Sequence, residues 1–215
     1  MAGLTEQTQE WSGEFGRSYT DRNDLGLEEI EKLYLAQFGI SRRELNTEFL
    51  GNLPRDLSIL EVGCNVGNQL AFLSEMGFTR LAGVEVQDYA LARARERLPD
   101  ALLVRGSALA LPFPDGVFDL VFTSGVLIHI HPDHLPKVLA EVHRVTRDWI
   151  WGLEYFAPTS TEVSYRGQQS LLWKAPFANL YLRSFSDLTY MQERWLPYQG
   201  NSGNVDSMYL LRKLE

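Results

Sequence analysis

The sequence contains a single cysteine, Cys64, among its 215 residues. One cysteine cannot form a disulfide within the chain, and proteins without disulfides are typical of reducing compartments. No run of apolar residues approaches the roughly 18 that a membrane-spanning helix needs. The first residues, MAGLTEQTQEWSGEFG, also lack the basic and apolar regions of a secretory signal. These absences lead us to expect a cytoplasmic protein with no membrane partner.

Basic residues are few: 20 lysines and arginines stand against 28 acidic residues, which gives a formal net charge of −8. Such a surface repels a phosphate backbone, so we expect no nucleic-acid partner. The chain is 45% hydrophobic, which suits one globular domain with a substantial core.

Short apolar runs alternate with amphipathic stretches from residue 57 onward. This alternation predicts an α/β fold, with a doubly wound parallel sheet covered by helices on both faces. The last part of the chain predicts a helix over 175–185 and then a β-hairpin around the turn 198–204, which adds one antiparallel strand at the sheet edge. We expect about seven strands in all. The predicted strands of the parallel part are 57–62, 80–86, 101–106, 118–125 and 148–156, and its predicted helices are 68–78, 88–98 and 132–145.

Residues 1–54 have a different pattern, and we expect them to form an N-terminal helical extension ahead of the domain 55–215. The range 25–39 has the apolar spacing of an amphipathic helix, and Ser41 followed by Glu44 predicts a capping box for a second helix.

The stretch EVGCNVGNQL, residues 61–70, follows the first predicted strand and opens a helix. A dinucleotide fingerprint, Gly-x-Gly-x-x-Gly, fails here because Asn65 and Asn68 occupy two of its glycine positions. An acidic-x-Gly-x-Gly-x-Gly loop fits at Glu61, Gly63 and Gly67, with Asn65 in place of the middle glycine. Asparagine tolerates left-handed backbone angles better than other non-glycine residues. We therefore predict a positive φ at Asn65, or a local hydrogen bond from its side chain.

The second predicted strand ends at Glu85 and Val86. A carboxylate at this point of an adjacent parallel strand is suited to bind the two hydroxyls of a ribose. The alternative is a solvent-exposed charge near a helix start.

With the loop and Glu85 together, residues 55–215 resemble the class I S-adenosylmethionine-dependent methyltransferases, which have a Rossmann-like fold with an antiparallel seventh strand. The resemblance implies S-adenosylmethionine as cofactor. Many members carry Asp where Ser107 stands, so the Ser107 hydroxyl or the Ala108 backbone would replace it at adenine. The cofactor residues implied are Glu61, Gly63, Asn65 and Gly67 for methionine and ribose, Glu85 and Val86 for ribose, Ser107 and Ala108 for adenine, and Ser124 and Gly125 for the methionine end.

A finer resemblance is to the pseudaminic-acid-biosynthesis-associated methylases, on the segments 11–23, 61–67, 124–130, 154–156 and 165–167. It suggests a sugar substrate in cell-surface glycan synthesis. It also implies that the N-terminal segment folds over the cofactor as a lid, with Tyr19 and Arg22 as contacts and Arg22 near the carboxylate. On spacing alone, Trp11, Phe15 and Tyr19 share one helical face that packs either in the core or over a ligand.

Methyl transfer to a hydroxyl needs a general base, and histidine is the commonest. His129 follows the fourth strand beside the expected methyl group, and Glu154 ends the fifth strand as the second candidate. The alternative for each of these two side chains is a structural role. Tyr155, Tyr165 and Arg166 come from a segment suited to cover the acceptor, and Arg166 suits a phosphate or carboxylate.

The expected acceptor is therefore a small polar metabolite, foremost a hydroxyl of a nucleotide-linked or phosphorylated sugar. N-methylation of an amino sugar or another small amine is the alternative. A nicotinamide oxidoreductase and a non-catalytic cofactor-binding protein are weaker alternatives. The run HIHPDH, 129–134, suggests metal ligands, but Pro132 and Asp133 fit a helix start better, so we expect no metal site. Cys64 is expected to be a packing residue.

Overall fold

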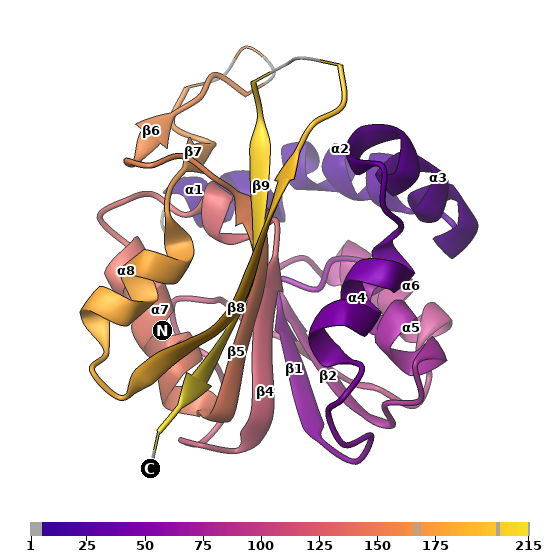
Figure 1. Ribbon diagram of the computed structural model, residues 1–215. Coiled ribbons are helices and arrows are strands. Elements are labelled where there is room, and N and C mark those ends of the chain that lie inside the picture. Colours follow the sequence, from indigo (N-terminus) through magenta and orange to yellow (C-terminus); the bar gives the residue numbers. More distant parts are fainter. Residues whose placement is uncertain (1–5, 166, 168, 201–202, 215) are drawn as a thin grey trace.

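The computed structural model describes residues 6–165, 167, 169–200 and 203–214. Its main sheet has seven strands in the order β3-β2-β1-β4-β5-β9-β8 (Figure 1). Strands β1 to β5 are parallel, and β9 runs antiparallel to both of its neighbours, β5 and β8. The strands are β1 (Ser58–Val62), β2 (Arg80–Glu85), β3 (Leu102–Arg105), β4 (Phe118–Ser124), β5 (Thr146–Tyr155), β8 (Leu188–Pro197) and β9 (Val205–Lys213).

Helices cover both faces of this sheet, so the predicted doubly wound fold is confirmed (Figure 1). A second, two-stranded sheet of β6 and β7 was not predicted from the sequence. The remaining elements are α1 (Glu6–Ser12), α2 (Glu14–Asn23), α3 (Leu27–Phe38), α4 (Arg42–Leu50), α5 (Asn68–Glu75), α6 (Asp88–Arg97), the 3-10 turn η1 (Leu127–His129), α7 (Leu135–Val145), β6 (Thr161–Glu162), β7 (Trp173–Lys174) and α8 (Phe177–Ser184).

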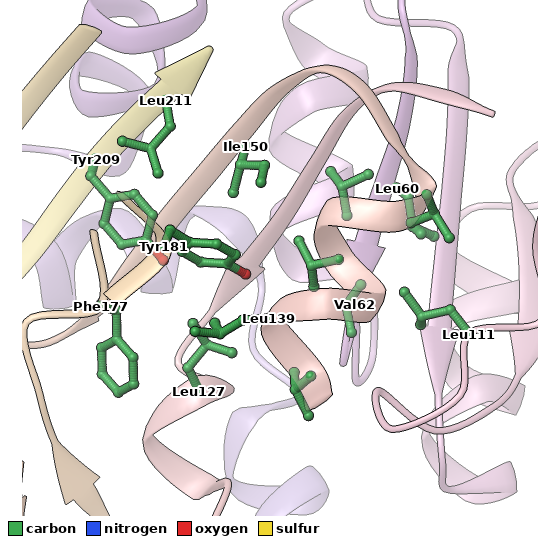
Figure 2. Close-up of a cluster of buried hydrophobic side chains, with 14 of the residues drawn as sticks. Leu60, Val62, Leu111, Leu127, Leu139, Ile150, Phe177, Tyr181, Tyr209 and Leu211 are labelled. Atoms are coloured by element: carbon green, nitrogen blue, oxygen red, sulfur yellow. The ribbon is translucent and has the colours of Figure 1, made fainter. Parts of the chain in front are cut away.

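Two buried apolar clusters hold these layers together. On one face, α7 and α8 pack against the sheet through side chains such as Leu139, Phe177 and Tyr181 (Figure 2). On the other face, α4, α5 and α6 contribute residues such as Leu45 and Leu70. Burial of this kind stabilises the domain by about 25 cal/mol for each Å² of apolar surface removed from water. The packing fixes the carboxyl ends of the parallel strands at one edge.

Helix α7 starts at Leu135, three residues later than the sequence indicated. The residues before it form a tight turn, in which the backbone N–H groups of His134 and Leu135 donate to the carbonyl of His131 at 2.8 and 3.0 Å. Pro136 lies in the first turn of the helix, where a backbone N–H has no intrahelical partner to lose. The predicted helix start at Pro132 is therefore wrong.

The N-terminal helices α1 to α3 lie over the carboxyl edge of the sheet (Figure 1). The helix is interrupted at Gly13, between α1 and α2. The predicted aromatic group nevertheless forms, because the Trp11 ring lies 5.2 Å from both the Phe15 and the Tyr19 rings. Ser41 and Glu44 form the predicted capping box of α4. Within the part of the chain that the structure describes, no helix has the length and apolar character to span a membrane.

Candidate functional site

A cavity of about 390 Å³ lies at the carboxyl edge, between the loops after β1, β2 and β4 and the N-terminal helices. The sheet order reverses between β1 and β4, and ligands of open α/β sheets bind at such a switch point. The predicted loop residues Glu61, Gly63 and Asn65 line this cavity, and Gly67 stands just behind them at the start of α5.

Asn65 has a φ of 46°, so the predicted left-handed conformation at this position is confirmed. Gly63 and Gly67 also have positive φ, both 75°. A Cβ atom at Gly63 would lie 2.7 Å from Val126, and one at Gly67 would lie 2.8 Å from Leu98. Positive φ therefore favours glycine or asparagine at all three positions, and close packing adds a second requirement for glycine at Gly63 and Gly67.

Glu85 ties the end of β2 to this loop. Its carboxylate accepts hydrogen bonds from the backbone N–H groups of Asn65 at 3.0 Å, Val86 at 2.8 Å and Gln87 at 3.0 Å. Burial raises the pKa of Glu85, while these three donors act in the opposite direction. The side chain lines the cavity together with Val86, as a ribose-binding group should.

The loop after β3 forms the next part of the wall. Ser107 and Ala108 line the cavity with Leu109, and the Ser107 hydroxyl accepts a hydrogen bond from the Leu109 backbone N–H at 3.2 Å. The serine thus shapes its own turn. Its placement fits the predicted adenine end, where apolar Leu109 adds a surface for a flat ring.

The N-terminal helices contact the cofactor loop directly. Thr20 Oγ1 lies 3.1 Å from Asn65 Oδ1 and 3.0 Å from Gln87 Oε1. The side chain of Asn68 donates to the backbone carbonyl of Asn23 at 2.7 Å. Helix α2 therefore closes one side of the cavity and is held in place by the same loop that it covers.

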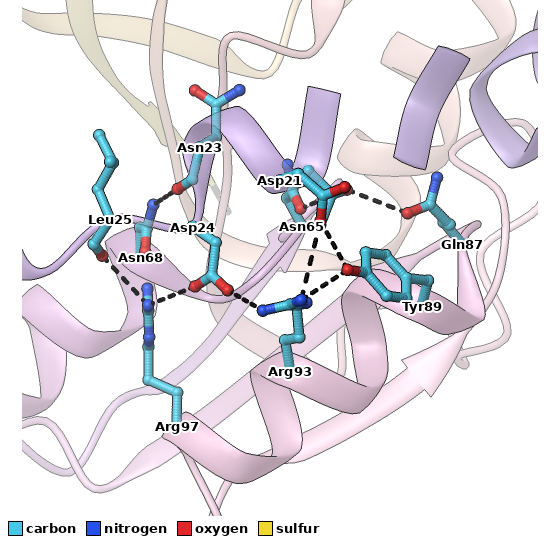
Figure 3. A network of polar contacts seen from close by, with 11 residues as sticks. Asp21, Asn23, Asp24, Leu25, Asn65, Asn68, Gln87, Tyr89, Arg93 and Arg97 are labelled. Carbon is cyan, nitrogen blue, oxygen red and sulfur yellow. Dashed lines mark hydrogen bonds and ion pairs between the residues drawn. The ribbon is translucent and has the colours of Figure 1, made fainter. Parts of the chain in front are cut away.

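An ion-pair network holds α2 against α6 (Figure 3). Asp24 accepts hydrogen bonds from Arg93 and from Arg97, the latter at 2.9 Å. At the outer end, the Tyr89 hydroxyl donates to Asp21 at 2.6 Å. We call these five residues the α2–α6 network. It links the extension to the domain outside the cavity.

His129 lies in η1, after β4, and lines the cavity beneath Trp11, whose ring is 4.4 Å from the imidazole. Its Nδ1 is 2.8 Å from the carbonyl oxygen of Leu171. Because a carbonyl can only accept, Nδ1 carries the proton, and Nε2 is left as the basic nitrogen. Burial lowers the pKa of His129 to about 4, so the ring is neutral at pH 7.

Glu154 is fully buried behind this turn and is not among the described residues that line the cavity. Its carboxylate accepts from the backbone N–H groups of Val126 at 3.1 Å and Ile128 at 3.4 Å. Burial raises its pKa to about 7. These contacts position η1, and through it His129. They differ from the direct contact with the acceptor that the sequence suggested for Glu154.

The other predicted side chains lie in different places. Ser124, Gly125 and Tyr155 line the cavity, and so does Tyr19, whose pKa is raised by burial. Tyr165 contacts the His129 ring from outside at 5.5 Å. Arg22 is exposed on α2 and is not among the described cavity residues, and Arg166 lies outside the described residues.

Sequence reasoning missed Arg42, a buried guanidinium at the cavity wall. It donates to Gln69 at 2.7 Å, to the Tyr34 hydroxyl at 2.7 Å and to Ser124 at 3.3 Å. Beside it, Glu61 has one buried carboxylate oxygen with no hydrogen-bond partner among the described residues. Burial raises the pKa of Glu61, and Arg42 opposes that rise. The only sequence signal for Arg42 was its position just inside a helix cap.

Asp206 was also missed. It lies near the start of β9 and lines the cavity. Among the described residues, no group of three or more His, Cys, Asp or Glu side chains is arranged to hold a metal ion.

The buried polar atoms fit a methyl-donor cofactor. Glu61 Oε2 and Asn68 Oδ1 have no hydrogen-bond partner among the described residues, and both residues line the cavity. S-Adenosylmethionine carries an ammonium, ribose hydroxyls and an adenine amino group, which donate hydrogen bonds to such oxygens. Arg42 offers the complementary charge for the cofactor's carboxylate.

Comparison with known proteins shows what the central part of this chain is similar to. A family model described as "Methyltransferase domain" matches residues 60–148. An uncharacterised methyltransferase of Synechocystis sp. is 37% identical over 89 residues, 41% of this chain and 42% of that protein. An uncharacterised protein of Haemophilus influenzae is 29% identical over 133 residues, 56% of this chain and 53% of that protein. The chain thus spans about half the length of these curated relatives.

Among solved structures, the fold is similar to that of 1,6-didemethyltoxoflavin-N1-methyltransferase of Burkholderia thailandensis, with bound 1,6-didemethyltoxoflavin and S-adenosylhomocysteine. The TM-score is 0.73 at 20% identity, and the match covers 100% of this chain and 92% of that one. Residues 60–148 thus match a methyltransferase domain, and the seven-stranded order is that of the Rossmann-like methyltransferase fold.

Proposed function

We propose that this chain transfers the methyl group of S-adenosylmethionine to a hydroxyl of a small sugar derivative, nucleotide-linked or phosphorylated. The observation that carries the proposal is the placement of His129: buried at the cavity wall, held through Nδ1 by Leu171, and neutral, with Nε2 as a proton acceptor. Such an imidazole suits general-base catalysis on a hydroxyl.

The chain's own residues divide the cavity between cofactor and acceptor. Glu85 would hold the ribose, Ser107 and Ala108 would border the adenine, and Arg42 would bind the carboxylate beside Ser124. When bound, S-adenosylmethionine supplies an activated methyl group on a sulfonium. The remaining wall, with Trp11, His129 and Tyr155, is then left for the acceptor.

The contribution of the protein is mainly to position the acceptor and exclude water. His129 takes the hydroxyl proton on Nε2 as the oxygen attacks. Glu154 keeps η1 in place by its bonds to two backbone N–H groups, so we assign it a positioning role. Tyr165 and the aromatic residues of α1 and α2 cover His129.

N-methylation of an amino sugar or another small amine is the second candidate. The observation that favours it is the fold match over the whole chain to an enzyme named as an N1-methyltransferase. A neutral amine needs less help from a base, so the two candidates differ in how much they depend on His129.

The test combines calorimetry with methyl transfer. S-Adenosylhomocysteine should bind, NADH should not, and isotope-labelled methyl groups should appear on members of a panel of nucleotide sugars and sugar phosphates. His129→Gln should lower the rate on a hydroxyl acceptor by about 10²–10⁴-fold and leave S-adenosylhomocysteine affinity unchanged. His143→Gln, which changes a histidine paired with Asp187 outside the cavity, is the matched control.

Three outcomes count against the proposal. Binding of NADH without S-adenosylhomocysteine would exclude a methyltransferase. Transfer to amines alone, with most of the rate kept in His129→Gln, would favour the second candidate. Cofactor binding with no transfer to either class would indicate a protein that binds the cofactor without catalysis.

A further inference from the structure

Asp206 is a carboxylate at the cavity wall to which the methyltransferase motifs assign no role. It reaches this edge because β9 runs antiparallel to β5: its residue 206 is paired with Tyr155, at the carboxyl end of β5. The side chain is 94% buried, as its relative exposure is 6%. The reversed strand thus places an acid beside the acceptor wall.

One oxygen of this carboxylate has no partner. Asp206 Oδ1 is buried and, within the described part of the chain, accepts no hydrogen bond. The side chain is hydrogen-bonded to that of Tyr198, which helps to lower its pKa. A buried carboxylate oxygen without a hydrogen bond destabilises the fold until a donor meets it.

The cations nearest to Asp206 are engaged elsewhere. Lys174 donates its Nζ hydrogen bond to Asn204, and Arg42 donates to Gln69, Tyr34 and Ser124. Glu154 adds a repelling charge. Burial, the largest of these effects, raises the pKa of Asp206 to about 7. Lys174 and Arg42 attract the charge of Asp206, but among the described residues neither forms an ion pair with it, so a ligand can supply a directly paired positive group.

The walls around this oxygen suit a cation. Tyr34 and Tyr155 line the same cavity as Asp206, and aromatic faces attract ammonium groups when water is excluded. Arg42 is expected to face the cofactor's carboxylate, so its charge is neutralised when the cofactor is bound. What remains at the acceptor end is the carboxylate of Asp206, which shares the cavity wall with Tyr34 and Tyr155.

We propose that Asp206 binds a protonated amino group of the methyl acceptor, which makes the acceptor an amine-bearing small molecule. This inference rests on the proposed function and deepens it. It holds both for a hydroxyl acceptor that carries an amine elsewhere, such as an amino sugar, and for an amine that is itself methylated after losing its proton.

The test uses two probes of one shape, cyclohexylamine and cyclohexanol, titrated by calorimetry into the full chain saturated with S-adenosylhomocysteine at pH 7.5. Cyclohexylamine should bind at least tenfold more tightly than cyclohexanol. In Asp206→Asn the preference should fall below about threefold. Asp187→Asn, which neutralises an acid outside the cavity, should keep the wild-type preference.

The controls separate this inference from the proposed function. S-Adenosylhomocysteine should bind wild type and Asp206→Asn within about threefold of each other. A tenfold loss in the variant would place Asp206 in the cofactor's site and overturn the inference. So would equal or absent binding of the two probes to wild type, or an amine preference that survives in Asp206→Asn.

If wild type fails to bind S-adenosylhomocysteine, the proposed function is lost. The probe titrations on the chain alone then decide the amine site by the same criteria. If Asp206→Asn does not fold, the test uses the wild type alone. Its preference for cyclohexylamine over cyclohexanol and the buffer dependence of the cyclohexylamine binding enthalpy are then measured. An amine that displaces a proton from Asp206 should release protons on binding, and an unchanged enthalpy in buffers of different ionisation heat would contradict the inference.

Discussion

The two ends of the cavity are built in different ways. At the cofactor end, one carboxylate, Glu85, is held by three backbone N–H groups from residues 65, 86 and 87. At the acceptor end, His129, Tyr155 and Asp206 come from η1, β5 and β9, and each has its own support. The cofactor end is thus built by backbone groups around one carboxylate, whereas the acceptor end is built by side chains that the fold brings together from separate elements. Substitutions should therefore act on cofactor affinity at one end and on the acceptor at the other.

The largest effect on cofactor affinity is expected from Glu85→Ala. It removes the acceptor of three backbone N–H groups together with the proposed ribose contact, and bonds to a charged group are worth about 1.5–3 kcal/mol each. S-Adenosylhomocysteine affinity measured by calorimetry should fall about 100-fold or more. Asp88→Ala, an exposed acid three residues on that pairs with Arg105, should change it less than twofold. A loss below threefold at Glu85 would mean that the cofactor end does not depend on this carboxylate.

The next effect tests the backbone of the same end. At Asn65, with φ 46°, a β-branched residue is strained, whereas glycine is not. Asn65→Val should weaken S-adenosylhomocysteine binding by about tenfold, and Asn65→Gly should stay within about threefold of wild type, although it loses the contact of the side chain with Thr20. Equal binding by the valine and glycine variants would show that the loop conformation does not control affinity.

The titration of Asp206 at the acceptor end should make the stability of the protein depend on pH. Folding raises the pKa of Asp206 from 3.8 to about 7. Between these values the folded chain holds the proton and the unfolded chain does not, so stability is present below pH 4 and is lost as pH rises through 7. Asparagine does not titrate, so the variant does not lose stability through this group as the pH rises. Asp206→Asn should therefore gain on the order of 1–3 kcal/mol relative to wild type between pH 5 and pH 8.

Chemical denaturation of both proteins at the two pH values gives this difference directly. His129 titrates in both proteins, so its effect cancels in the comparison, whereas the repulsion between Glu154 and Asp206 is part of the difference that is measured. His129 acts in the opposite direction, since its depressed pKa adds stability as pH rises from about 4 to 6.5. A constant difference between variant and wild type at pH 5 and 8 would contradict a buried, protonated Asp206.

The smallest effect concerns the α2–α6 network, which lies outside both ends. Asp24 is the half-buried centre that pairs with Arg93 and Arg97, and Asp21 is its exposed outer member. Asp24→Asn should lower the unfolding free energy by about 1 kcal/mol, and Asp21→Asn by less than about 0.5 kcal/mol, because exposed pairs are screened by solvent. Equal losses of unfolding free energy in the two variants would show that the burial of the acid does not determine its contribution to stability.

Sequence alone predicted the geometry of the loop after β1 because the residues of this loop lie close together in the chain. Glu61, Gly63, Asn65 and Glu85 span a strand, a turn and the next strand, and this local pattern carries both the fold and the loop geometry. The positive φ of Asn65 follows from the same pattern. The seven-stranded order follows from the alternation of strands and helices, whereas the short β6–β7 sheet has no such signal.

The acceptor end depends on how distant segments pack, and that information is not local. Arg42 occupies a helix start whose sequence indicated only a cap, and Asp206 stands in a strand whose direction decides which edge it reaches. Arg22, which the sequence analysis expected near the cofactor's carboxylate, is exposed on α2, because Asp24 and α6 set the orientation of that helix. Glu154 lies at the carboxyl edge of the sheet, as expected. Its oxygens nevertheless accept hydrogen bonds from backbone N–H groups of η1 and the residue before it, which only the folded turn provides.

The direction of β9 also decides where the protein can be attached to a surface. Its first residues border the cavity, and its other end lies at the opposite edge of the sheet, near the C mark in Figure 1. An affinity handle or fluorophore joined after Leu214 would leave the cavity open, whereas one joined at α1 would sit beside Gln7 and Trp11, which line it. Immobilised through its carboxyl-terminal end, the chain would present its ligand site to the solution.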